Sequence, residues 1–225
     1  MDGVEAMNQI AVVSIGYGSS EMLTEESKRI VLGTETLILR TKRHPIVQYL
    51  ELHEKSYETL DSFYENSDSF DMLNRNAAEF IIQKLQSANV CYCVNDPLND
   101  SIVSQLKALL HATEQIIIVP GISYAQVCLS ACCALGGARI YSAEEFLQKP
   151  VSPSENLLIT ELHSRECAGE CKLHLLEYMP EETTVKFVSG IESNGKTKVQ
   201  DILLYEMDRI KKYDHLCAVY IPAVS

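Results

Sequence analysis

The sequence predicts a two-domain α/β protein, with an N-terminal parallel sheet flanked by helices and a C-terminal mixed sheet with helices. Short apolar strands alternate with helices in the first half, whereas strands follow one another directly in the second half. The chain has 225 residues, enough for two domains of roughly 100 to 120 residues each. We place the domains at 1–118 and 119–225.

The first half alternates strands and helices, a pattern typical of parallel sheets. The helix over 70–86 has the clearest signal, because Phe70, Leu73, Ala77 and Ile81 recur at helical spacing. In order along the chain, strands are expected at 10–15, 37–39, near 57–60, 90–94 and 116–119, and helices at 24–32, 46–52, 70–86 and 101–110.

The strand over 116–119 runs into Pro120-Gly121, a turn signal, and then into a small, apolar helix over 124–135 with Ser123 at its N-cap position. Such a junction leaves backbone amides and a hydroxyl at the carboxyl edge of the sheet. Open α/β sheets bind ligands at that edge. The sequence therefore predicts a small-molecule site here.

The second half contains four further strand signals and one clear helix over 164–178. The strands are expected at 157–160, 184–188, 199–205 and 216–221. Strands joined without an intervening helix are at least partly antiparallel, so this half is predicted to form a mixed sheet.

Charge and hydropathy exclude several functional classes. The net charge of −12 opposes nucleic-acid binding, which needs clustered Lys and Arg. No apolar run reaches the roughly 20 residues of a membrane span, and Met1 to Glu5 lacks a basic segment preceding an apolar one. We therefore expect a cytoplasmic protein that contacts neither membrane nor nucleic acid, with its 8 cysteines reduced. A nicotinamide enzyme is disfavoured because no Gly-x-Gly-x-x-Gly fingerprint is present.

One group of side chains invites a metal interpretation. His163, Cys167, Cys171 and His174 share a helical stripe, and two of them could hold one metal ion. Four ligands along a single helix cannot close a tetrahedron, and no Cys-x-x-Cys pair exists to complete a zinc site. Core packing is the favoured interpretation, and no metal is predicted.

Four motifs together resemble the tetrapyrrole (corrin/porphyrin) methylase family. They are Gly16-Tyr17-Gly18, Glu21-Met22-Leu23-Thr24, Asn95-Asp96-Pro97 and Val119-Pro120-Gly121-Ile122-Ser123, in the family's order and spacing. The resemblance covers nearly the whole chain. It implies a methyltransferase that binds S-adenosylmethionine between two α/β domains, releases S-adenosylhomocysteine, and forms a homodimer.

A narrower resemblance concerns three further segments: Arg40-Thr41 with His44-Pro45, Phe63-Tyr64-Glu65 with Asp68-Ser69-Phe70, and Asp214-His215-Leu216 with Tyr220-Ile221-Pro222. They resemble the methylase-like N-terminal domain of bacterial fusion proteins that carry a MazG nucleotide pyrophosphohydrolase. No acidic metal-binding helices follow within these 225 residues. We expect either a domain of such a fusion or a stand-alone relative.

The resemblance assigns the substrate side to the first loop, which includes Gly16, Tyr17, Gly18 and Ser19. The family pattern Gly-x-Gly-Pro-Gly-Asp-Pro becomes Ser14-Ile15-Gly16-Tyr17-Gly18-Ser19-Ser20, so one glycine, both prolines and the aspartate are replaced. Two functions stay open: an active methyltransferase acting on a tetrapyrrole or other small molecule, and a catalytically degenerate ligand-binding or regulatory module.

For the methyl donor, the resemblance points to Asn95, Asp96 and Pro97 on the second loop, to Ser123 and Tyr124, and to Leu162 against the adenosine. Asn is the best non-glycine residue where φ must be positive. His44 is interpreted as a loop residue beside Pro45 rather than as a general base, and no catalytic residue is assigned, since methyl transfer mainly requires an in-line nucleophile. Arg40, Lys42 and Arg43 could form a basic patch for a polycarboxylate substrate.

Overall fold

A computed structural model describes residues 8–67, 69–110, 115–191 and 197–223. Two compact units are present, Met1–Ser123 and Tyr124–Ser225. The predicted boundary lies between 118 and 119, whereas the N-terminal unit of the structure extends to Ser123, because Val119 pairs with Val13 in the N-terminal sheet. Asp68, part of one motif, and Met1 to Glu5 at the N-terminus lie outside the described residues.

The N-terminal unit contains a five-stranded sheet of order β3-β2-β4-β1-β5. All four strand pairs are parallel, as the alternation of strands and helices predicted. The strands are β1 (Ile10–Ser14), β2 (Thr36–Leu39), β3 (Glu58–Thr59), β4 (Val90–Val94) and β5 (Ile116–Val119). Every residue of β4 is buried, as expected for a central strand covered on both faces.

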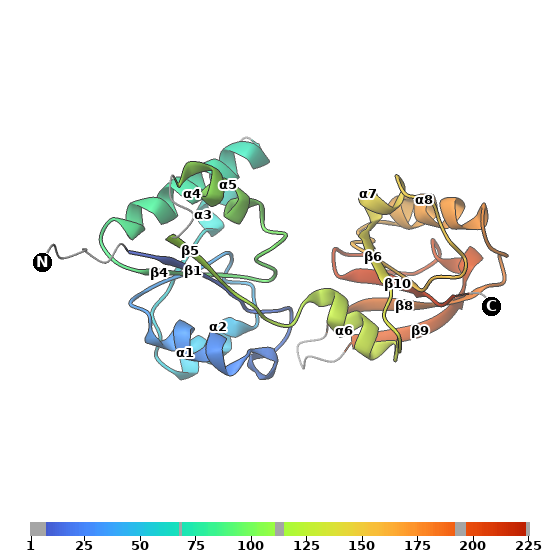
Figure 1. Ribbon diagram of the computed structural model, residues 1–225, viewed down its shortest axis with the longest axis horizontal. Helices are drawn as coiled ribbons and strands as arrows, with labels where there is room; N and C mark the ends of the chain where they lie inside the picture. Colours follow the sequence, from blue (N-terminus) through green and yellow to red (C-terminus); the bar gives the residue numbers. More distant parts are fainter. Residues whose placement is uncertain (1–7, 68, 111–114, 192–196, 224–225) are drawn as a thin grey trace, which may run out of the picture. The chain divides into compact units, whose positions relative to one another are not determined.

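Helices cover both faces of this sheet (Figure 1). One face carries α3 (Asp61–Asn66), α4 (Phe70–Leu85) and α5 (Ser101–Leu109), and the other carries α1 (Glu25–Gly33) and α2 (Ile46–Leu52). Each face has its own apolar cluster, with Ile81 and Ile102 in the first and Val31 and Leu50 in the second. The sheet is therefore a packed three-layer core whose carboxyl edge is left to loops.

The C-terminal unit contains a mixed sheet of order β6-β7-β10-β8-β9. Only the β6–β7 pair is parallel; the other three are antiparallel, which confirms the predicted mixed sheet. The strands are β6 (Arg139–Ser142), β7 (Leu157–Thr160), β8 (Thr184–Ile191), β9 (Thr197–Leu203) and β10 (Cys217–Ile221). The helices are α6 (Tyr124–Ala131), α7 (Ala143–Phe146) and α8 (Arg165–Leu176).

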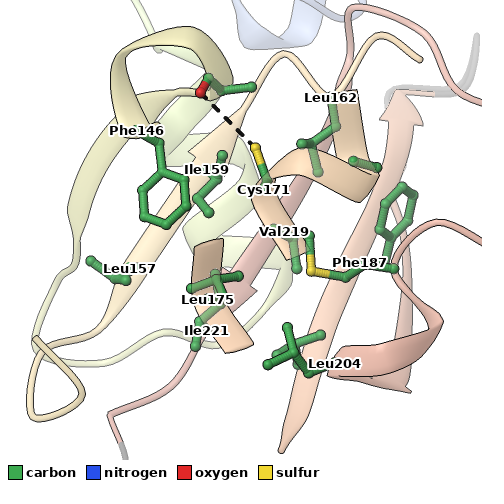
Figure 2. Packing of buried hydrophobic residues seen from close by; sticks show 14 of the residues in the cluster. Phe146, Leu157, Ile159, Leu162, Cys171, Leu175, Phe187, Leu204, Val219 and Ile221 are labelled. Atoms are coloured by element: carbon green, nitrogen blue, oxygen red, sulfur yellow. Dashed lines mark hydrogen bonds between the residues drawn. The ribbon is translucent and has the colours of Figure 1, made fainter. Parts of the chain in front are cut away.

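The core of this unit packs α8 against the sheet (Figure 2). Cys171 and Leu175 of α8 lie among Phe146, Phe187 and Val219, all of them buried. The sequence prediction missed β6 and α7, because β6 is a short edge strand whose first two residues are exposed and whose apolar alternation is weak. It also extended α6 to residue 135, whereas the helix ends at Ala131.

The end of α6 has a backbone cause. Cys133 adopts a left-handed φ of 52°, and the glycines at 136 and 137 have positive φ as well. Residues in that conformation stop a helix. In the part of the chain that the structure describes, no helix combines the length and apolar character needed to cross a membrane.

Candidate functional site

The carboxyl edge of the N-terminal sheet gathers the predicted motif loops of this unit. Because β2, β4, β1 and β5 are parallel neighbours, the loops that follow them leave the sheet at one edge. The first loop follows β1, the Asn95-Asp96-Pro97 loop follows β4, and Pro120 to Ser123 follows β5. The sequence motifs of the N-terminal unit are therefore brought together at one edge of its sheet.

Ser14, at the end of β1, joins the three loops. Its Oγ donates a hydrogen bond to the carbonyl oxygen of Asn95 at 3.0 Å, and its own carbonyl accepts one from Ser27 Oγ at 3.3 Å. On the other side, a Cβ added to Gly121 would lie 2.5 Å from Ser14 Oγ and 2.7 Å from Ser14 Cβ. Glycine at 121 is thus what allows the β5 loop to approach β1.

The first loop turns at Gly16, which has a φ of +64°. Its carbonyl lies 3.0 Å from Nε2 of the buried His44, and His44 Nδ1 accepts a hydrogen bond from the backbone N–H of Ile46 at 3.1 Å. Since Nδ1 is an acceptor, the proton is on Nε2, which donates to Gly16. His44 therefore links the first loop to α2 as a neutral imidazole, in agreement with its interpretation as a loop residue.

The buried His44 is expected to make folding stability depend on pH. Burial lowers the pKa of His44, although its bond to Gly16 acts in the opposite direction. In the unfolded chain His44 takes up a proton near pH 6.5, whereas in the folded chain it stays neutral until a lower pH. The free energy of unfolding therefore falls as the pH drops from about 6.5 toward the folded-state pKa. Urea unfolding at a series of pH values between 7.5 and 5 measures this decline.

In this experiment His44→Asn should flatten the decline, while the same substitution at the exposed His53 should leave it in place. An unchanged pH profile in His44→Asn would show that the ring is not held neutral.

The second loop differs in one respect from expectation. The described non-glycine residues with positive φ are Glu54, Cys133 and Glu161, so Asn95 is not one of them. Asn95 therefore is not present here to supply a left-handed backbone. The side chain of Asp96 makes its hydrogen bonds within the loop: its carboxylate accepts from the Leu98 N–H at 3.1 Å and from Asn99 Nδ2 at 2.9 Å. This turn leads directly to the start of α5.

Arg40 follows β2 at the same edge and forms an ion pair with Asp100. Asp100 is buried and caps α5, accepting a hydrogen bond from the Val103 N–H at 3.0 Å. Burial is the largest single effect and lowers the pKa of Arg40, but Asp100, Tyr92 and Tyr64 together outweigh it, so the pKa of Arg40 is raised. Arg40 is thus already neutralised, so it contributes little free charge to the predicted patch with Lys42 and Arg43. The sequence analysis did not predict this pair. The sequence signal that pointed to part of it is Asp100 directly before Ser101, the position of a helix N-cap.

Two predicted donor residues belong to the C-terminal unit. Tyr124, the first residue of α6, is buried and donates its hydroxyl hydrogen bond to the Leu216 carbonyl; burial, together with nearby Cys128, raises its pKa. Leu162 is fully buried in the core of this unit (Figure 2). Its N–H donates to the Cys217 carbonyl at 3.0 Å. Ser123 immediately precedes α6 and ends the N-terminal unit.

The His/Cys stripe on α8 is divided among separate partners. His174 Nε2 lies 2.9 Å from the Lys149 carbonyl, and Cys171 Sγ faces the Ala143 carbonyl from within the core (Figure 2). His163 and Cys167 both contact the Glu161 carbonyl. Across the described residues, no three His, Cys, Asp or Glu side chains are grouped so as to hold a metal ion. Burial raises the pKa of Cys171 to about 12, in keeping with a packed thiol.

Comparison with known proteins identifies the fold. No family model matches the sequence. "Uncharacterized protein YabN" of Bacillus subtilis (strain 168) is 25% identical over 224 residues, covering 96% of this chain and 45% of that protein. The chain thus spans about half the length of the curated relative that it matches.

Three solved structures are similar over nearly the whole chain. Uroporphyrin-III-C-methyltransferase from Thermus thermophilus has a TM-score of 0.71 at 15% identity, covering 96% of this chain and 94% of its own. The cobalamin synthesis related protein CobF from Corynebacterium diphtheriae scores 0.70 at 14% identity, with 98% and 100% covered. Diphthine synthase scores 0.65 at 16% identity, with 96% and 90% covered. The chain therefore has the two-domain α/β fold of these proteins.

Proposed function

We propose that this chain is an S-adenosylmethionine-dependent methyltransferase of the tetrapyrrole methylase family that acts on a small molecule. The observation that carries the proposal is the meeting of the Gly16, Asn95 and Gly121 loops at one sheet edge. The fold shared with a uroporphyrin-III-C-methyltransferase and with diphthine synthase supports it. It is also the edge at which open α/β sheets hold ligands.

The loops of the N-terminal unit offer groups that suit the donor. The side-chain amide of the half-buried Asn95 has no hydrogen-bond partner among the described residues, while its carbonyl is held by Ser14. A free amide at the sheet edge can both donate to a carboxylate and accept from a hydroxyl or amine. We assign to the donor the six residues Asn95, Asp96, Pro97, Ser123, Tyr124 and Leu162. The polar side chains of Asp96 and Tyr124 already make hydrogen bonds within the chain, so Asn95 is the residue whose side chain we test.

When bound, S-adenosylmethionine supplies the methyl group as a sulfonium. The protein's main contribution is to position the acceptor, because methyl transfer chiefly requires a nucleophile held in line with the methyl group. Gly16 and Ser19 lie on the loop assigned to the acceptor. Both ring nitrogens of His44 are hydrogen-bonded to backbone groups, those of Gly16 and Ile46, so His44 acts as a positioning residue for that loop.

A second candidate function is a regulatory ligand-binding module that keeps the fold without the transfer step. The altered first loop favours it: Ser14 uses its hydroxyl to hold Asn95, and Ser19 stands where the family pattern has an aspartate. The chain also spans only 45% of its curated relative. We propose in this case association with a MazG-type pyrophosphohydrolase, and in either case a cytoplasmic homodimer.

Calorimetric titration with S-adenosylhomocysteine tests the donor site. We expect binding by the unmodified chain and a roughly tenfold weaker affinity in Asn95→Ala, which loses one buried polar contact worth about 1 to 1.5 kcal/mol. Asn99→Ala is the matched control, because that amide bonds Asp96 within the same turn, and its affinity should stay unchanged.

The outcomes separate the two functions. No heat at millimolar ligand would contradict both methyl transfer and donor sensing. Binding without transfer to any offered small-molecule acceptor would favour the regulatory module.

A further inference from the structure

One carboxylate fixes three successive residues of the loop between β2 and α2, which we call the β2 loop. Asp61, the first residue of α3, accepts a hydrogen bond from Thr41 Oγ1 at 2.7 Å through one oxygen and from the Lys42 N–H at 2.9 Å through the other. Thr41 Oγ1 in turn accepts a hydrogen bond from the Arg43 N–H at 3.2 Å. The loop is therefore held up to the residue directly before His44.

The Asp61 carboxylate does not serve its own helix. An acidic residue in the first turn of a helix ordinarily interacts with the free N–H groups there. Among the described residues, no side chain caps α3, whose N-cap position is Leu60. Both oxygens of Asp61 bond to the β2 loop instead. The contact with the loop thus takes the place of the usual helix cap.

The same side of α3 makes a second contact with the β2 loop. Tyr64 lies three positions after Asp61, a spacing that puts both side chains on one side of the helix. Tyr64 Oη accepts a hydrogen bond at 2.7 Å from Nε of Arg40, the first residue of the loop. Leu60 and Phe63 anchor this segment in the apolar cluster of the α4–α5 face. The segment is therefore attached to the core through its apolar residues and to the loop through its polar ones.

The hydrogen bonds of Asp61 are made to a charged acceptor. Partial burial raises the pKa of Asp61, but hydrogen bonds from Lys42, Thr41 and Thr59 outweigh it, so the pKa is lowered. The carboxylate is therefore ionised at neutral pH, and hydrogen bonds to an ionised acceptor are roughly twice as strong as those between neutral groups. They fix a loop that is otherwise exposed to solvent at Lys42 and Arg43.

His44 connects the β2 loop to the first loop. Its Nε2 donates to the Gly16 carbonyl at 3.0 Å, and its Nδ1 accepts from the Ile46 N–H at 3.1 Å. The ring is buried, and Gly16 is the residue at which the first loop turns. A displacement of the β2 loop would therefore move the ring and the carbonyl that the ring holds.

We propose that Asp61 is a positioning residue for the first loop, acting through the β2 loop and His44. Only the assignment of the first loop to the methyl acceptor rests on the proposed function; the chain of hydrogen bonds does not. In the proposed enzyme, Asp61 contributes to placing the acceptor and leaves the donor loop unaffected, because Ser14 holds the carbonyl of Asn95.

Exchange of the His44 ring proton with solvent, measured by NMR at pH 7.5, tests this role. In the unmodified chain the proton on Nε2 should give a protected resonance, assigned with His44→Asn, because it is buried and hydrogen-bonded. Asp61→Ala should raise its exchange rate at least about tenfold, since the β2 loop loses two hydrogen bonds to a charged acceptor. The amide resonance of Tyr17 should shift as well, because its peptide includes the Gly16 carbonyl.

Glu58→Ala is the matched control. Glu58 lies three residues before Asp61, and its carboxylate pairs with Lys84 Nζ at 2.6 and 2.8 Å. That variant loses a nearby charged contact that does not involve the β2 loop, so its exchange rate should stay within about twofold of the unmodified chain. Equal exchange rates in Asp61→Ala and Glu58→Ala would overturn the proposal, as would the absence of a protected ring proton in the unmodified chain.

A second variant keeps the test decisive if Asp61→Ala does not fold. Thr41→Val retains the carboxylate but removes the hydroxyl that joins Asp61 to the Arg43 N–H. It should speed the exchange of the His44 ring proton as well, by less than Asp61→Ala does. An unchanged exchange rate in this variant would count against the role of the β2 loop.

Titration with S-adenosylhomocysteine on the same samples separates this role from the proposed function. Asp61→Ala should bind this ligand like the unmodified chain, and a loss of binding would contradict a role confined to the first loop. No binding by the unmodified chain would remove the methyltransferase while the chain of hydrogen bonds stands. Binding by the unmodified chain with unchanged ring-proton exchange in Asp61→Ala would remove the positioning role alone.

Discussion

Replacing Gly121 by alanine is expected to destabilise the N-terminal unit by about 2 to 3 kcal/mol, because the new Cβ would overlap the buried Ser14 side chain. The overlap is with Oγ at 2.5 Å and with Cβ at 2.7 Å, distances that no real contact of this kind shows. Ser14 cannot move aside freely, since its Oγ holds Asn95 and its carbonyl holds Ser27. Urea unfolding measures the free energy of unfolding of each variant.

A double-mutant cycle identifies the cause. Ser14→Gly alone should cost about 1 to 2 kcal/mol, through the lost hydrogen bond and the added backbone freedom. In the double variant the two atoms closest to the added methyl are gone, so the combined cost should fall short of the sum by at least about 1 kcal/mol.

The control for this cycle is Gly33→Ala, at the end of α1, where an added Cβ meets nothing within 4 Å. Its effect should be neutral or slightly stabilising. Full additivity of Gly121→Ala and Ser14→Gly would show that the two residues do not touch as described. The cycle also concerns the candidate site, because the same contact sets how closely the β5 loop approaches Ser14, which holds the carbonyl of Asn95.

Replacing Asp100 by alanine should cost about 3 kcal/mol. Roughly 1 kcal/mol comes from the lost cap of α5, and the remainder from leaving the Arg40 charge without its partner. The second contribution is below that of a fully buried pair, because the Arg40 side chain is 33% exposed and water screens it. Chemical denaturation at neutral pH measures the loss.

Two further variants separate the contribution of the helix cap from that of the ion pair. Asp100→Asn keeps an oxygen that can cap Val103 and removes the charge, so it should retain the cap contribution and lose the ion pair. Ser69→Ala is the control, because Ser69 caps α4 through the Met72 N–H at 3.3 Å and has no charge to lose. If Asp100→Ala cost no more than Ser69→Ala, the ion pair would contribute nothing measurable.

Much of the fold could be predicted because its signals are local. Buried parallel strands such as Val90–Val94 are short continuous apolar runs, and α4 has apolar residues at helical spacing after its Ser69 cap. Both patterns depend on residues a few positions apart. The missed strand, Arg139–Ser142, lies at a sheet edge, where partial exposure weakens the pattern.

The candidate site was predictable only as a set of loops. The alternation of strands and helices placed the first loop, the Asn95 loop and the Gly121 turn at one edge of a parallel sheet. Which atoms meet there was not predictable, since Ser14 bonds Asn95 across 81 positions of the chain. The expectation of a positive φ at Asn95 was wrong, because the loop closes through Ser14 and Asp96 instead.

By itself the sequence determined the two-domain α/β architecture, the order of most of its elements and the sheet edge at which the motif loops gather. The tertiary structure alone decided that Gly121 must be a glycine, that Arg40 is neutralised by Asp100, and that Asp61 holds the β2 loop. The physical reason is the range of the interactions. Periodicity and capping act over one or two turns, whereas steric contact, ion pairing and hydrogen-bond satisfaction depend on side chains that only the folded chain brings together.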